Sequence, residues 1–245
     1  VPAPQDDEQG PGELARPFDL PRDIPLPAGL LRPADDEHVL LTVLPHIAAD
    51  PWPTEALLRD PIAPYRSRLE GSAPRWQPLP VQYADYTLWQ HDLLDHTELG
   101  RAQADFWRDA LTGAPERIDL PFARRRPVVA GGDGAFVDVS WPADLHERVT
   151  AMAAQNGASV FMVLQAALAA LFTRLGAGED LVIGAPVAGR GDDALDGLVG
   201  FFVNMLPLRT DTSKDHTFRD LLGRFRRTDL HASAHQSTPF ERLAA

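Results

Sequence analysis

The sequence predicts a mixed fold of helices and strands (α/β, of the α+β kind). An apolar run at residues 38–44 lacks a polar face, which is typical of a strand buried on both sides. Residues 83–111 instead space their aromatic and leucine side chains as a helix does. A chain of 245 residues that is 44% hydrophobic can bury the core of one large domain or of two lobes.

The first elements are interrupted by proline. Residues 24–32 are partly apolar but contain two prolines and a glycine, which predicts an edge strand or an irregular extended segment. Residues 54–69 have helical composition, and Pro61 and Pro64 each remove a backbone donor inside it. We therefore expect two short helical pieces or one kinked helix.

The middle of the chain predicts two helices and a linker. Within residues 83–111, Gly100 offers a break between two packed helices, and the aromatic residues are assigned to packing. Residues 120–134 contain several prolines and glycines and are the best linker candidate. The arginine run at 124–126 is interpreted as a solvated part of that linker rather than a docking patch.

The second half predicts alternating elements. Val137, Val139 and Trp141 alternate with polar residues as in a half-buried strand, and a helix follows at 142–155. Ser159 is placed to cap a helix that ends near Gly176, and its broad apolar surface predicts a core position. The remaining predictions are strands at 180–187 and 200–209, and a helix that begins with Thr217 and Asp220 and ends near His235.

Composition excludes several classes of function. The formal charge of −12 disfavours a nucleic-acid partner. The chain has no cysteine, so thiolate chemistry, disulfides and thiolate metal sites are absent. The polar start has no signal-peptide pattern, and the apolar run at 160–172 is too short to cross a bilayer. We expect a cytoplasmic protein with no membrane partner.

Four sequence motifs carry a resemblance to condensation domains of nonribosomal peptide synthetases. YADYTLWQ at 83–90 resembles the family's YxDYxxWQ, and IGAPVAGR at 183–190 is similar to IGxPVAGR. VGFFVNML at 199–206 matches VGFFVNTL, a form that epimerisation domains lack, and HQSTPFE at 235–241 resembles HQDLPFE.

The resemblance implies a two-lobed fold, a pseudo-dimer like chloramphenicol acetyltransferase with a tunnel between its lobes. Residues 1–122 would belong to the N-terminal lobe, and residues 123–245 would form a linker and the first part of the C-terminal lobe. The family's RHExLRTxF start and its C-terminal crossover strands are not found here, so we expect the fold to be incomplete at both ends.

The family's HHxxxDG motif falls on residues 45–51. His46 takes the place of the second histidine, which the resemblance implies is catalytic, beside the attacking amine and the thioester carbonyl. Asp50 matches the structural aspartate, whose arginine partner we expect in the missing upstream motif. Without the flanking motifs, a lone histidine at a strand end is more often a hydrogen-bonded loop residue.

Two residues depart from this motif. Pro45 replaces the first histidine, a loss that catalysis is expected to survive. Pro51 replaces the glycine, and it removes an N–H near the expected oxyanion, which predicts a misshapen loop. The spacing of His46 and Asp50 also suits a metal on a helix, but no third ligand is evident, so no metal site is predicted.

Three functions follow from the resemblance. One is amide-bond formation between amino acyl groups carried on the phosphopantetheine arms of carrier proteins, with no directly bound cofactor. Another is an inactive, X-type domain that recruits oxygenases such as cytochromes P450 to a carrier-bound peptide, in contact with neighbouring synthetase domains. A free-standing acyltransferase is the weakest, since no coenzyme pocket is evident. Arg190 and Asn204 are assigned to lobe structure.

Overall fold

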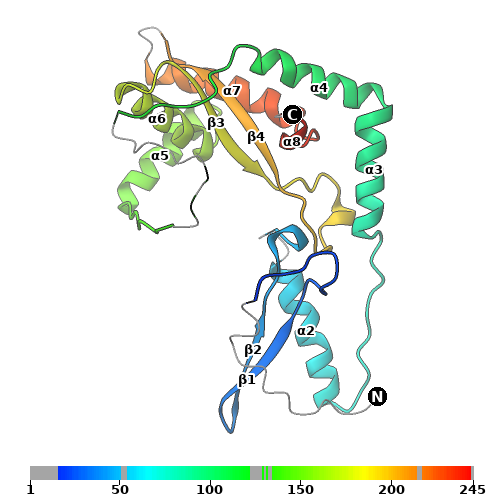
Figure 1. The fold of residues 1–245 in the computed structure, drawn as a ribbon. Helices are drawn as coiled ribbons and strands as arrows, with labels where there is room; N and C mark the ends of the chain where they lie inside the picture. The colour runs from blue at the N-terminus through cyan, green and yellow to red at the C-terminus, as the bar shows by residue number, and fades with distance from the viewer. Residues whose placement is uncertain are drawn as a thin grey trace. The chain divides into compact units, whose positions relative to one another are not determined.

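The computed structural model describes residues 16–50, 54–121, 129, 131, 134–213 and 217–243. Its contacts divide the chain into two compact units, and Figure 1 shows the elements of each. The first unit is Val1–Gln90 with Ala188–Val203, and the second unit is His91–Val187 with Asn204–Ala245. The predicted lobe boundary, between residues 122 and 123, lies outside the described residues and stays a prediction.

The first unit contains a two-stranded antiparallel sheet. Strand β1 (Ala28–Ala34) pairs with β2 (Glu37–Thr42), which confirms strands in both predicted segments. Burial of β2 on both sides is wrong, since Val39 is 44% exposed and Leu40 is 52% exposed. In the described part of the chain these two strands form a sheet by themselves, so β2 is an edge strand and not the central strand that the prediction required.

Helix α2 (Thr54–Leu69) runs through both Pro61 and Pro64 as a single element. Of the two predicted alternatives, two short helical pieces are wrong and one helix is found. Proline deprives a carbonyl one turn earlier of its donor. Both prolines are nevertheless accommodated within the one helix, and Pro61 lies at an exposed position of it.

Helices α3 (Tyr83–His96) and α4 (Glu98–Leu111) confirm the two helices predicted for residues 83–111. The break lies at Thr97, whose Oγ1 accepts a hydrogen bond from the backbone N–H of Gly100 at 3.0 Å. Gly100 has a different role from the predicted one. A Cβ there would lie 2.3 Å from the carbonyl oxygen of Leu93, so glycine is needed for close approach after the break.

The second unit pairs β3 (Asp180–Val187) with β4 (Asn204–Asp211) in antiparallel register. Strand β3 confirms its prediction, whereas β4 begins four residues later than predicted. The helices are α5 (Ala143–Gln155), α6 (Val160–Arg174), α7 (Phe218–Ala234) and the short α8 (Phe240–Leu243). Ser159 and Thr217 cap α6 and α7 as predicted, each in a capping box.

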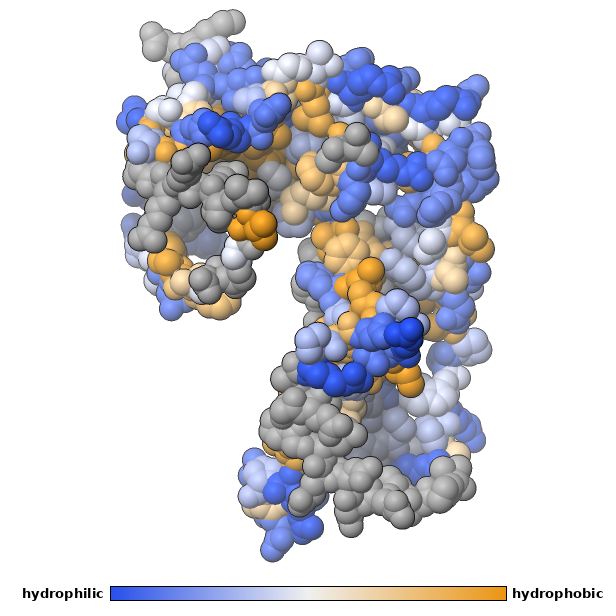
Figure 2. All heavy atoms as spheres, in the orientation of Figure 1, coloured by the Kyte–Doolittle hydropathy of each residue, from blue (hydrophilic) through white to orange (hydrophobic). Residues whose placement is uncertain are grey.

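The core of the second unit lies where α6 packs on α7. Ala166, Ala169 and Phe225 are fully buried there. A second cluster surrounds Trp107, whose indole N–H donates to the carbonyl of His235 at 2.8 Å. Helix α6 is less buried than its composition predicts, because Leu171 is half exposed. Apolar residues accordingly reach the surface in both units (Figure 2).

The predicted strand at Val137, Val139 and Trp141 is wrong. Residues 134–142 form no helix or strand, and Val137 is 86% exposed. Alternation favours a strand only where a neighbouring strand supplies hydrogen bonds, and no described strand lies beside this segment. Across the described ranges, no single helix is long and apolar enough to cross a membrane. Helices α5 and α6, which are bent against each other, reach that length and apolar composition only when they are counted together.

Candidate active site

The loop that carries the family motif lies in the first unit, directly after β2. Pro45 has φ −68°, the value that its ring favours, so proline fits here without backbone strain. A single 3₁₀ turn, η1 (His46–Ala48), follows and leaves the His46 side chain exposed. Replacement of the first motif histidine by Pro45 is therefore compatible with an ordered loop.

His46 is oriented by one hydrogen bond and one ring contact. Its Nδ1 lies 3.2 Å from the carbonyl oxygen of Ala49. A carbonyl can only accept, so Nδ1 carries the hydrogen in this contact, and in the neutral ring Nε2 is left with a free lone pair. The ring also meets Phe201 edge to face, with centroids 5.3 Å apart. The imidazole can thus present a basic nitrogen in a fixed direction.

Asp50 joins this loop to a segment far along the chain. Its Oδ2 accepts hydrogen bonds from the backbone N–H groups of Phe202 at 2.8 Å and Val203 at 3.2 Å, although Phe202 lies 152 residues later. The backbone N–H of Asp50 donates to the carbonyl of Gly200 at 3.1 Å. The Asp50 side chain is fully buried. The end of the motif loop is therefore fixed from both its backbone and its side chain.

Arg190 compensates the buried charge of Asp50. Its Nη2 lies 3.7 Å from Oδ1 of Asp50, and its side chain is only 5% exposed. The guanidinium also lies 4.0 Å from the ring centroid of Phe202 and donates to the carbonyl of Leu195, in the turn η2 (Asp193–Leu195). Asp50 thus has an arginine neighbour within this chain, whereas the partner expected in the upstream motif stays a prediction.

Sequence reasoning missed this pair although a signal was available. Burial of an unpaired carboxylate is costly, so a structural aspartate such as Asp50 favours a cation nearby. Arg190 was assigned to lobe structure, yet it stands in the PVAGR motif, next to a glycine that needs a special conformation. Gly189 has φ +66°, and a Cβ there would lie 1.8 Å from the carbonyl oxygen of Phe202. Only glycine allows this approach, which brings Arg190 to the loop.

Tyr83 supports the same segment. Its hydroxyl donates to the carbonyl of Phe201 at 2.7 Å, and burial raises the pKa of Tyr83, so the donor stays protonated. A Cβ at Gly200 would lie 2.3 Å from the Tyr83 ring. The packing role predicted for the aromatic residues holds for Tyr83, Tyr86 and the buried Trp107, whereas Trp89 is 56% exposed.

The remaining predicted site residues lie elsewhere. Pro51 and the arginine run at 124–126 fall outside the described residues. Asn204 has the structural role predicted for it, since its Nδ2 donates to the carbonyls of Gln236 at 2.8 Å and Thr238 at 2.7 Å. Among the described residues, no group of three or more acidic or histidine side chains is placed to hold a metal ion.

Comparison with known proteins identifies the family to which this chain belongs. The model of the family "Condensation domain" matches residues 6–245. A probable nonribosomal peptide synthetase, CymA, of Salinispora arenicola is 49% identical over 99% of this chain, which covers 3% of that protein. The isonitrile lipopeptide synthase of Mycobacterium tuberculosis is 49% identical over 92% of this chain, which covers 9% of it. The chain thus spans a small part of these relatives.

Solved structures agree with the predicted fold. The X-domain from teicoplanin biosynthesis is 35% identical with a TM-score of 0.88, and the match covers 95% of this chain and 52% of that chain. The same kind of domain in complex with OxyB is 36% identical with a TM-score of 0.87, over 93% of this chain and 51% of that chain. The chloramphenicol-acetyltransferase-like fold class is therefore confirmed, and this chain belongs to the condensation-domain family of nonribosomal peptide synthetases.

Proposed function

We propose that this chain carries the reacting part of a domain that forms amide bonds between amino acyl or peptidyl groups held as thioesters on carrier proteins. The observation that supports it is the orientation of His46. Its Nδ1 is occupied by the Ala49 carbonyl, so the neutral ring has its Nε2 lone pair free for the acceptor amine.

In this reaction the amine nitrogen attacks the thioester carbonyl carbon while Nε2 of His46 accepts a hydrogen bond from the amine. The new C–N bond forms, the C–S bond breaks, and the proton lost by nitrogen reaches the departing sulfur. Both substrates arrive on phosphopantetheine arms of partner carriers. Asp50 and Arg190 act as positioning residues, because they hold the loop that bears His46.

The substitution of Pro51 for the family's glycine predicts a slow reaction. Proline has no N–H to offer to the oxyanion that develops on the thioester carbonyl. Loss of one such donor lowers rates by about a hundredfold. We expect activity well below that of a domain with glycine at this position, and Pro51→Gly to raise it.

The test uses the complete domain with loaded donor and acceptor carriers, and intact-protein mass spectrometry detects the condensed product. We expect product with the natural sequence and about a hundredfold less with His46→Ala. His38→Ala is the matched control, because His38 is an exposed histidine on β2 in the same unit. Equal product from the natural protein and His46→Ala would overturn the role of His46.

A second candidate is recruitment of an oxygenase, such as a cytochrome P450, to a carrier-bound peptide. It is favoured by the 36% identity to the X-domain that was solved in complex with OxyB. Together with Pro45 and Pro51 in the motif, this likeness makes a non-catalytic role the main alternative. No condensed product, combined with saturable binding of an oxygenase in sedimentation experiments, would establish recruitment instead of catalysis.

A further inference from the structure

His46 has an exposed side chain, although the reaction proposed above needs its Nε2 lone pair to point in one direction. The second side-chain torsion of histidine is broadly distributed, so an exposed imidazole turns readily unless its neighbours hold it. The hydrogen bond of 3.2 Å to the Ala49 carbonyl constrains the position of Nδ1 but not the tilt of the ring plane. A second contact is therefore needed to orient the ring.

Phe201 supplies this second contact. Its ring centroid lies 5.3 Å from that of His46, and the two ring planes meet at 76°. Aromatic rings favour such an edge-to-face arrangement, because the positive edge of one ring meets the negative face of the other. A change in the tilt of the imidazole would weaken this attraction. The hydrogen bond and the ring contact together define the direction of Nε2.

The backbone around Phe201 is fixed at three points. The carbonyl of Gly200 accepts a hydrogen bond from the backbone N–H of Asp50 at 3.1 Å. The N–H of Phe202 donates to Oδ2 of Asp50 at 2.8 Å, and the carbonyl of Phe201 itself accepts from the Tyr83 hydroxyl at 2.7 Å. The Phe201 side chain is partly buried. Phe201 is thus held firmly enough to restrain a mobile neighbour.

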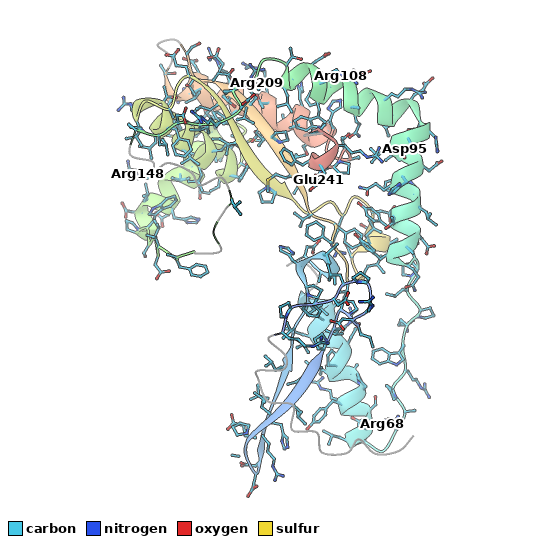
Figure 3. The ribbon with its side chains drawn as sticks, viewed as in Figure 1. Arg68, Asp95, Arg108, Arg148, Arg209 and Glu241 are labelled. Atoms are coloured by element: carbon cyan, nitrogen blue, oxygen red, sulfur yellow. The ribbon has the colours of Figure 1, made fainter. Side chains whose placement is uncertain are left out.

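The two contacts of His46 are joined through a single peptide group. The carbonyl oxygen of Ala49, which accepts from His46, belongs to the same peptide group as the N–H of Asp50, which donates to Gly200. The acceptor of the His46 hydrogen bond is therefore bonded directly to the segment that carries Phe201. All of these residues belong to the first unit, and Figure 3 draws the side chains as sticks.

We propose that Phe201 is a positioning residue that holds the His46 imidazole in the tautomer with its hydrogen on Nδ1 and with Nε2 directed at the acceptor amine. This inference rests on the function proposed above and adds a residue to that site. Phe201 acts through His46 and not on the reacting atoms. Its ring should therefore affect the rate of the chemical step and not the binding of carriers.

Nuclear magnetic resonance of the full chain with isotope-labelled histidine tests the orientation without any carrier. The chemical shifts of the two ring nitrogens report which of them bears the hydrogen, and His46→Ala identifies the His46 signals. At a pH where the ring is neutral, we expect the Nδ1–H tautomer to predominate in the natural chain. Phe201→Leu should lower its population, because an imidazole that turns away from Ala49 loses the acceptor for that hydrogen.

Phe18→Leu is the matched control, since Phe18 is partly buried in the same unit and does not stack on the His46 ring. Phe201→Tyr keeps the aromatic ring, so it should keep the natural tautomer population. An unchanged population in Phe201→Leu, or an equal change in Phe18→Leu, would overturn the positioning role. A change in Phe201→Tyr as large as in Phe201→Leu would overturn the ring contact as its cause.

Kinetics of the complete domain with loaded carriers give a second readout. Phe201→Leu should lower kcat by about tenfold and leave the KM for the acceptor carrier unchanged, because a misdirected base slows only the chemical step. A higher KM with unchanged kcat would overturn the role of Phe201. If the natural domain forms no product, the function proposed above fails, and the tautomer measurement alone decides whether Phe201 orients His46.

Discussion

Two buried aspartates, one in each unit, differ in whether other groups compensate the charge of the carboxylate. Asp50 in the first unit is 4% exposed and has Arg190 and the N–H groups of Phe202 and Val203 as partners. Asp229 in the second unit is 8% exposed, and neither of its oxygens has a hydrogen-bond partner among the described residues. Burial accordingly raises the pKa of Asp229 to about 6.

One carboxylate therefore organises the structure around it, whereas the other destabilises the folded state. Asp50 bonds backbone groups distant in the sequence, so its charge defines the shape of the motif loop. Asp229 lies on the buried face of α7 that includes Phe225 and Ala232, where an apolar side chain would pack without a desolvation penalty. Removal of the two carboxylates should therefore change stability in opposite directions.

The largest effect is expected for Asp50→Ala. It leaves the buried guanidinium of Arg190 without its anion and two N–H groups without their acceptor, so the free energy of unfolding should fall by about 3–5 kcal/mol. Urea denaturation followed by circular dichroism measures this. Asp60→Ala, at an exposed position of α2, should change stability little. A loss below about 1 kcal/mol for Asp50→Ala would mean that Asp50 does not organise the loop.

Asp229→Asn should stabilise the chain above pH 6. The folded-state pKa of about 6 lies above the unfolded value of 3.8, so the carboxyl destabilises the fold progressively as the pH rises between these values. Two pKa units correspond to a gain of up to about 3 kcal/mol at pH 8. The gain should vanish near pH 4, where aspartate is protonated in the folded state.

Thermal unfolding at pH 4 and pH 8 measures the effect of Asp229→Asn. Asp109→Asn is the control, because Asp109 is exposed on α4 in the same unit. Equal stability of the natural chain and Asp229→Asn at pH 8 would show that Asp229 has a compensating partner after all.

Tyr83→Phe should have the smallest effect. It removes one neutral hydrogen bond, to the carbonyl of Phe201, so we expect a loss of about 1 kcal/mol in the same urea experiment. Tyr65→Phe, on the exposed side of α2, is the control. A loss as large as that of Asp50→Ala would assign the position of segment 200–203 to Tyr83 rather than to Asp50.

Local signals predicted the helices well. Ser159 and Thr217 marked the starts of α6 and α7 because a cap acts on backbone groups within three residues of itself. Predictions that depended on distant partners were less reliable. Val137 alternates with polar neighbours yet forms no strand, and Val39 lies in a strand but is exposed, because both outcomes depend on which segments cover them.

The sequence by itself determined the family, through four motifs in order, and most element boundaries in the second unit, through caps and apolar periodicity. Only the tertiary structure decided that Arg190 is the cation beside Asp50, and that Gly189 allows the close approach to the Phe202 carbonyl that brings Arg190 to the loop. The physical reason is sequence distance. Caps and periodicity act over a few residues, whereas pairing of buried charges joins segments that the chain separates by well over a hundred residues.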